Sequence, residues 1–185
     1  MRKRKSVRII AIALLCTLMI GAAIGIGVAA NSSTGSNVAS IGMKNLEYGE
    51  EMKLAIQVTK VMAEGDLYLG VWPEGTTDFA NVKPVYYTNE ILEETTADGD
   101  PITYALTQGI NAKDIGKKFV FCAYVVNGDE TSYGDYITYS VETYLVERLD
   151  AIKNDESDLA SNQRTLYEAV IAYGEAAGAL LNKAE

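Results

Sequence analysis

The chain has 185 residues, with 25 acidic and 16 basic side chains and a formal net charge of −9 at pH 7. It contains no histidine, so it cannot build a Ser-His-Asp triad, a Cys-His pair or a usual zinc site. It also lacks the Gly-x-x-x-x-Gly-Lys loop that cradles phosphates. These absences exclude most hydrolase classes and argue against an enzyme, a metal site or a cofactor.

The first 30 residues have the layout of an export signal. Residues 2–8 carry five basic side chains and no acid, and the apolar run 9–30 is interrupted only by Thr17 and ends in Val28-Ala29-Ala30. As a helix, these 22 residues would span about 33 Å, enough to cross a bilayer core. Residues 1–30 are therefore either a signal peptide cleaved after Ala30 or a retained membrane anchor. Either alternative predicts a secreted protein or one at the extracytoplasmic face of the membrane.

Residues 31–39 are polar and small, which is the composition of a flexible linker. Removing the five basic residues of the leader from the net charge of −9 leaves −14 on residues 31–185. No cluster of Lys and Arg follows Arg8, and phosphate groups are bound by such clusters. The sequence thus predicts no nucleic-acid partner, and contact with the membrane only through residues 9–30 if they stay uncleaved.

Residues 40–140 predict a β-sandwich domain. Apolar residues alternate with more polar ones from Met52 to Val58, which is the period of a strand with one wet face. The run 118–126, which begins with Lys118, is apolar on both faces, as expected of a central strand, and Asn127-Gly128 predicts a type I′ hairpin turn. Further strands are expected at 67–72, at 82–87 with Pro84 favouring an edge, at 102–107 and around 136–139, and an acidic loop at 93–101. About six or seven strands indicate a mainly β, immunoglobulin-like or fibronectin-like antiparallel sandwich.

Residues 141–185 predict a helical hairpin. The first helix has one apolar stripe, with Ser140 placed as its N-cap; the stripe contains Val141, Tyr144, Leu145, Arg148, Leu149 and Ile152. The second helix has a heptad-like seam, formed by Leu159, Gln163, Leu166, Val170, Tyr173, Ala177 and Leu180. Gly174 and Gly178 are spaced for close backbone approach. We expect part of the seam to rest on the sandwich, and the alternative is that it binds a protein partner.

Four short stretches occur in a characteristic order: 109–116, 121–125, Tyr-Ser-Val-Glu-Thr-Tyr at 139–144, and 166–177 with Tyr-Gly-Glu-Ala-Ala inside it. Their order resembles an uncharacterised module of large secreted or surface proteins of Gram-positive gut bacteria. In that module an immunoglobulin-like sandwich ends in a Tyr-Ser-Val-x-x-Tyr helix and a Tyr-Gly-x-Ala-Ala helix. The resemblance covers about residues 46–182. It implies an external, accessory and non-catalytic role, and supplies no catalytic residue.

Two features that suggest chemistry have simpler interpretations. Cys122 lies in the middle of an apolar strand, where a thiol is more often a small buried hydrophobe than a nucleophile. The acidic loop holds Glu93, Glu94, Asp98 and Asp100, but it lacks the spaced ligands of a calcium loop. We therefore predict a solvated turn there and no catalytic residue.

Aromatic residues give the remaining candidate site. The chain has 12 tyrosines against 3 phenylalanines, and a tyrosine can pack on one side and hydrogen-bond on the other. The candidate ligand-binding residues are Trp72, Tyr86, Tyr87, Tyr133 and Tyr136. Ordinary strand packing is the alternative role for these rings.

The sequence favours a non-catalytic interaction or adhesion module of a bacterial surface, with a protein or glycan partner. The alternative function is a carbohydrate-binding module that uses Trp72 and surface tyrosines. An exposed, planar strip of Trp72 and tyrosines would favour a sugar ligand. An exposed apolar stripe along residues 159–180 would favour a protein.

Overall fold

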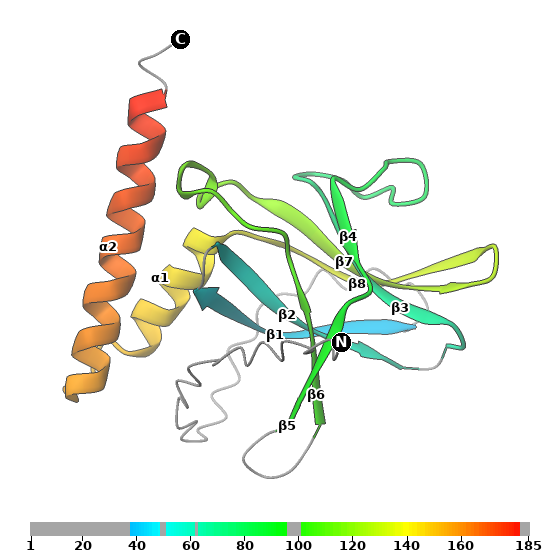
Figure 1. Cartoon of the computed structure of the whole chain (residues 1–185), viewed down its shortest axis with the longest axis horizontal. Helices are drawn as coiled ribbons and strands as arrows, with labels where there is room; N and C mark the ends of the chain where they lie inside the picture. The colour runs from blue at the N-terminus through cyan, green and yellow to red at the C-terminus, as the bar shows by residue number, and fades with distance from the viewer. Residues whose placement is uncertain (1–37, 49–50, 62, 96–100, 182–185) are drawn as a thin grey trace, which may run out of the picture.

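The structure, a computed structural model, describes residues 38–48, 51–61, 63–95 and 101–181. The predicted leader at 1–30 and nearly all of the predicted linker at 31–39 lie outside these ranges. The described residues form two four-stranded antiparallel sheets followed by two C-terminal helices (Figure 1). The prediction of a mainly β chain with two antiparallel sheets and C-terminal helices is confirmed.

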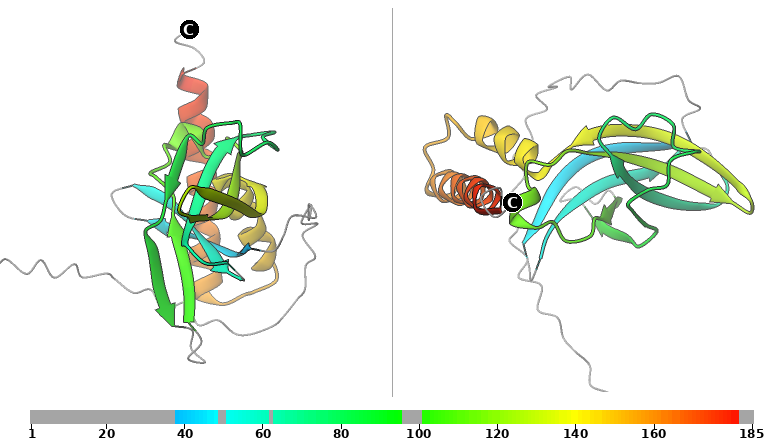
Figure 2. Two further views of the ribbon diagram at one scale, coloured as in Figure 1. Left: turned by 90° about the vertical axis from the view of Figure 1, so that its right-hand side faces the viewer. Right: turned by 90° about the horizontal axis from the view of Figure 1, so that it is seen from above.

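Each sheet is built from strands that are not all neighbours in sequence. Sheet A contains β1 (Ala39–Tyr48), β2 (Met52–Lys60), β6 (Pro101–Leu106) and β5 (Ile91–Thr95), in that spatial order. Sheet B contains β4 (Tyr86–Thr88), β3 (Asp66–Pro73), β7 (Phe119–Asn127) and β8 (Glu130–Tyr139), in that order. The edge strands β1 and β8 lie next to each other, and both helices lie at one end of the sheets (Figures 1 and 2).

The main core lies between the sheets. Leu54 and Ile56 of β2 form one buried cluster with Leu69 of β3 and Phe121 of β7, all at most 1% exposed. Each such side chain stabilises the fold by about 1.5–3 kcal/mol relative to an exposed one. The alternation predicted from Met52 to Val58 thus places every second residue of β2 in this core.

β7 is buried on both faces, as its apolar sequence predicted. Phe121, Ala123 and Val125 point into the main core, whereas Val120 and Cys122 point to the opposite face of sheet B. β7 lies between β3 and β8 and is therefore an interior strand.

Two strands are missing from the sequence-based prediction. β1 escapes a period-two search because its pairing with β2 shifts register between Ile41 and Lys44, and such a bulge breaks the alternation. β5 overlaps the predicted acidic loop, which was wrong for residues 93–95. Its Glu93 lies opposite Thr103 of β6. Acidic residues are tolerated there because β5 is an edge strand, where charge discourages unwanted strand pairing.

Two further predictions need correction. The strand expected at 82–87 is shorter, since β4 begins at Tyr86, although it does lie at the edge of sheet B. The β7–β8 turn lies one residue later than predicted, because Asn127 pairs with Glu130 and leaves Gly128-Asp129 as the loop. Gly128 has φ +59°, and no non-glycine residue among those described has positive φ. A type I′ turn needs two positive φ values, so that assignment was wrong.

The first helix, α1 (Val141–Ala151), forms as predicted. The Ser140 hydroxyl accepts a hydrogen bond from the Thr143 backbone N–H at 3.0 Å, which caps the helix. Val141, Tyr144 and Leu145 are buried. The Tyr144 hydroxyl also donates to Asn45 Oδ1 of β1 at 3.1 Å, so α1 is tied to sheet A.

The second helix, α2 (Asp158–Leu181), packs against the rest of the domain through one face. Ala160, Tyr167 and Gly174, seven residues apart, are buried and define the inner face of the helix. This face rests on α1 and on the short 3-10 turn η1 (Ala112–Asp114), which the sequence did not reveal. A side chain at Gly174 would overlap Ile115, so glycine permits the close approach.

Of the predicted seam, Val170 is partly buried against the main core cluster, whereas the four large side chains spaced by seven are exposed. Leu159, Leu166, Tyr173 and Leu180 are 52%, 46%, 68% and 70% exposed. The inner face instead places Gly174 against Ile115 and Tyr167 in the main core cluster. The large apolar residues consequently point away from the rest of the domain.

Candidate functional site

The outer face of sheet B, opposite the main core, carries an aromatic cluster under the loop at 74–85. Trp72 is 1% exposed and meets Phe79 of that loop edge to face, with ring centroids 5.0 Å apart. The Trp72 Nε1–H donates to the Val82 carbonyl at 2.6 Å, and the Tyr133 hydroxyl donates to the Phe79 carbonyl at 3.0 Å. These two hydrogen bonds hold the loop over the rings, so the cluster is a second, smaller core.

The five candidate ligand-binding residues do not form one surface. Trp72 is buried, and Tyr133 and Tyr136 are half-buried against the same cluster. Tyr86 packs against the main core between the sheets, whereas its neighbour Tyr87 is 58% exposed. The structure thus brings three of the rings together beneath a loop, leaves Tyr87 exposed beside Tyr68 on the same face, and places Tyr86 in the other core. The buried indole of Trp72 has no free face on which a sugar could stack.

The tyrosines that remain on this face are not arranged as a planar strip. Tyr68 and Tyr124 stack on each other, with centroids 5.3 Å apart and an interplanar angle of 16°. The Tyr87 ring is tilted by 52° from that of Tyr68. The arrangement that would favour a sugar ligand is therefore missing among these described residues.

A groove runs between the sheets near β4 and the segment that follows β6. One part of it has a volume of about 260 Å³ and is lined by apolar side chains including Val71 and Phe121, with Asp114 and Lys117 among its polar residues. This volume lies below the roughly 300–1,000 Å³ of typical small-molecule sites. A second hollow of about 280 Å³ adjoins it at Tyr86.

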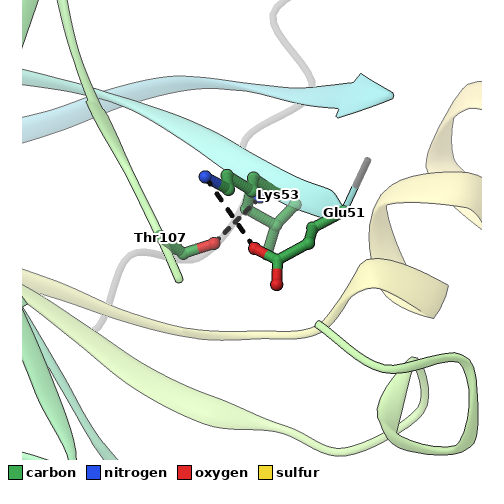
Figure 3. A network of polar contacts seen from close by, with 4 residues as sticks. Glu51, Lys53 and Thr107 are labelled. Atoms are coloured by element: carbon green, nitrogen blue, oxygen red, sulfur yellow. Dashed lines mark hydrogen bonds and ion pairs between the residues drawn. The ribbon is translucent and has the colours of Figure 1, made fainter. Parts of the chain in front are cut away.

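Figure 3 shows the polar contacts of Glu51, Lys53 and Thr107, which line the second hollow. The Thr107 hydroxyl accepts from the Leu54 N–H at 3.0 Å, and the Thr107 N–H donates to the Leu54 carbonyl at 2.9 Å, which extends the pairing of β2 and β6. Lys53 Nζ lies 4.0 Å from Glu51 Oε2 at an exposed position, a contact worth little. The Thr107 hydroxyl therefore serves the pairing of β2 with the segment that follows β6.

Cys122 is a buried thiol, as expected. It is 0% exposed, and burial raises its pKa to about 12. Because the thiolate is the nucleophilic form, this thiol is inert at neutral pH.

The outer face of α2 is the largest feature left without a role. We define this face as three rows of residues spaced by seven, all exposed. The rows are Leu159, Leu166, Tyr173 and Leu180; Asn162, Ala169 and Ala176; and Thr165, Ala172 and Ala179. None of these residues is charged, and across residues 159–180, all of which the structure describes, the charged side chains are Arg164, Glu168 and Glu175.

The three charged residues of this segment lie off the outer face. Arg164 Nη2 donates to the Ile152 carbonyl at 3.0 Å and so closes the end of α1. Glu168 and Glu175 are one helical row away from the face, seven residues apart. A helix that is apolar on its inner face and again on its outer face is typical of a helix buried on both sides. The sequence showed the heptad-like spacing of these residues, but not that they lie on the side of α2 that faces away from α1 and η1.

The chain matches no protein-family model, no curated protein and no solved structure. Within the described ranges no group of histidine, cysteine and acidic residues could hold a metal ion. The same ranges contain no helix that is both long and apolar enough to cross a membrane. The acidic residues Asp98 and Asp100 lie outside the described residues.

Proposed function

We propose that this protein is an extracytoplasmic, non-catalytic interaction module of a bacterial surface, and that the outer face of α2 binds a protein partner. The observation that carries the proposal is the uncharged, exposed strip along α2, headed by Leu159, Leu166, Tyr173 and Leu180. Exposed apolar patches of this kind on a soluble domain are typical of interaction sites. The remainder of the chain, an immunoglobulin-like sandwich by our interpretation, serves as the rigid body that presents the helix.

Three features support an external, non-catalytic role. The basic and apolar order of residues 1–30 is that of an export signal. The chain has no histidine, and its buried Cys122 thiol is inert. The acidic charge of the exported part keeps a domain soluble outside the cell. Burial of Trp72 weighs against the carbohydrate-binding alternative.

A site-specific cross-linking experiment tests the proposal. A photoreactive phenylalanine analogue is introduced at Tyr173 in the full chain, and separately at Asp129, an exposed residue of the β7–β8 turn. On illumination of the producing cells, we expect adducts of higher mass from position 173 and none from position 129. Equal yields from both positions, or no adduct from 173, would contradict the assignment of binding to α2.

A further inference from the structure

We propose that the partner of the α2 outer face is the α2 helix of a second copy of this chain, packed antiparallel. The proposal rests on the function assigned above and names the occupant of the same surface. It is carried by the spacing of the apolar residues and by the place of α2 in the fold, and the area of the face sets the strength expected of the pairing.

The spacing makes the face complementary to itself. The midpoint of α2 lies between Ala169 and Val170, and the large apolar residues are placed symmetrically about it. An antiparallel copy with full overlap therefore sets Leu159 opposite Leu180, and Leu166 opposite Tyr173. This register places the bulky Tyr173 against a smaller leucine, whereas parallel pairing would oppose two tyrosines. Antiparallel packing also aligns the helix dipoles favourably.

The small residues allow the two helices to approach closely. Ala169 and Ala176 lie beside the leucine row, and both are exposed. Leucine knobs alternating with alanine holes are the packing expected for a heptad-spaced helix pair. No acidic side chain lies on the face itself. Two copies of this acidic protein can therefore meet at this surface without placing carboxylates in contact.

Within the part of the chain that the structure describes, no residue covers the outer face of α2. The inner face at Ala160, Tyr167 and Gly174 points toward α1 and η1, and the outer face is on the opposite side of the helix. Figure 1 shows α2 as the outermost element at one end of the domain, with its C-terminal part extending beyond α1. The bodies of two paired copies would thus lie on opposite sides of the helix pair.

The size of the face predicts a weak, reversible pairing. A strip about 10 Å wide along a helix of about 36 Å covers roughly 360 Å² on each copy. Standard stable interfaces cover about 800 Å² per partner. We therefore expect monomers in dilute solution and pairing where chains are concentrated, as they are when tethered to one surface.

Disulfide cross-linking reads the orientation directly. The full chain carrying Cys16→Ala serves as the background, in which Cys122 is buried and unreactive. Oxidation with copper phenanthroline should give a covalent dimer of Ala169→Cys, which lies at the midpoint, and none of Glu168→Cys one residue away. Leu159→Cys alone should give no dimer, whereas Leu159→Cys combined with Leu180→Cys should. A dimer of Leu159→Cys alone would overturn the antiparallel arrangement.

Sedimentation of the same protein separates this inference from the proposed function. The wild-type chain should show reversible, concentration-dependent dimerisation, and Leu166→Asp should weaken the association by about 100-fold, with Trp72 fluorescence unchanged as the control for folding. A chain that stays monomeric at the highest concentration and forms no disulfide dimer would overturn the pairing with a second copy. If position 173 then still cross-links to a different protein, the pairing with a second copy is wrong and the proposed function stands. If position 173 cross-links to residues 9–30 of its own chain, both the pairing and the proposed function are wrong. If it cross-links to nothing, both fail.

Discussion

Two tyrosines on α2 allow a matched test of which side of the helix is packed. Tyr167 is 7% exposed and belongs to the main core cluster, whereas Tyr173, less than two turns further along, is 68% exposed. Tyr→Ala makes the same chemical change at both positions and changes helix propensity by the same small amount. Any difference in stability therefore reports on packing.

We expect a large effect at the inner position alone. Truncating a buried aromatic side chain costs about 3–5 kcal/mol, so Tyr167→Ala should lower the free energy of unfolding by about 3 kcal/mol. For a domain of this size that corresponds to a fall of roughly 6–12 °C in melting temperature. Tyr173→Ala removes an exposed ring and should change stability by at most about 0.5 kcal/mol.

Denaturant titration at submicromolar concentration provides the assay, since dilution removes any contribution from dimerisation. Fluorescence of the single tryptophan, the buried Trp72, reports unfolding of the sandwich, and far-ultraviolet circular dichroism reports the helices. Coincident transitions would indicate that helices and sheets unfold together. The reasoning is refuted if Tyr173→Ala destabilises the protein as much as Tyr167→Ala, because the predicted seam would then be the packed face after all.

Three further predictions concern other parts of the chain. Gly174→Ala should lower the melting temperature because a Cβ there overlaps Ile115. Gly178→Ala adds an atom with nothing within 4 Å, so it should raise the free energy of unfolding by up to about 1 kcal/mol through helix propensity. A gain in stability at both positions would contradict the close contact with η1. Burial raises the pKa of Cys122 from 9.0 and of Tyr124 from 10.0, each to about 12. Both groups therefore stay protonated in the folded protein at pH values where the unfolded chain has lost those protons. The free energy of unfolding should consequently fall between about pH 9 and 12, by up to about 1.4 kcal/mol per pH unit for each group, and Cys122→Ala should make the first part of that fall shallower. A denaturation midpoint independent of pH over this range would contradict the burial of these two groups. If the leader is cleaved after Ala30, the intact mass of the exported protein should correspond to residues 31–185, and an uncut N-terminus in the membrane fraction would identify an anchor instead.

The sequence predicted the helices and strands in which burial follows the regular period of the element. The alternation in β2, the unbroken apolar run of β7 and the stripe of α1 with its Ser140 cap each match the structure. Each of these patterns is produced by burial on one face, or on both, of a regular element. β1 and β5 escaped because a bulge and an edge position relax that requirement.

The sequence predicted the spacing of the apolar residues on α2, but not whether they face the domain or the solvent. The spacing predicts a seam that includes Leu159, Leu166, Tyr173 and Leu180, part of which packs on the sandwich, with a protein partner as the alternative. The inner face is instead set by the close contact of Gly174 with Ile115, a residue about 60 positions earlier in the chain. Likewise, nothing local to Trp72 indicates that Phe79 and Val82 cover its ring. The spacing of apolar residues within one helix or strand does not show such contacts with residues far away in the sequence.

The most direct test of the central claim is the accessibility of Tyr173 on the producing cell. Tyr87, 58% exposed on β4, serves as an internal reference for Tyr173, which is 68% exposed in the isolated chain. Brief radical labelling of tyrosine rings is carried out on cells and on purified protein at high dilution, and the ratio of label at the two residues is read by peptide mass spectrometry. If the outer face of α2 binds a partner, labelling of Tyr173 relative to Tyr87 should fall several-fold on the cell. An unchanged ratio would contradict the claim that this face is an interaction surface.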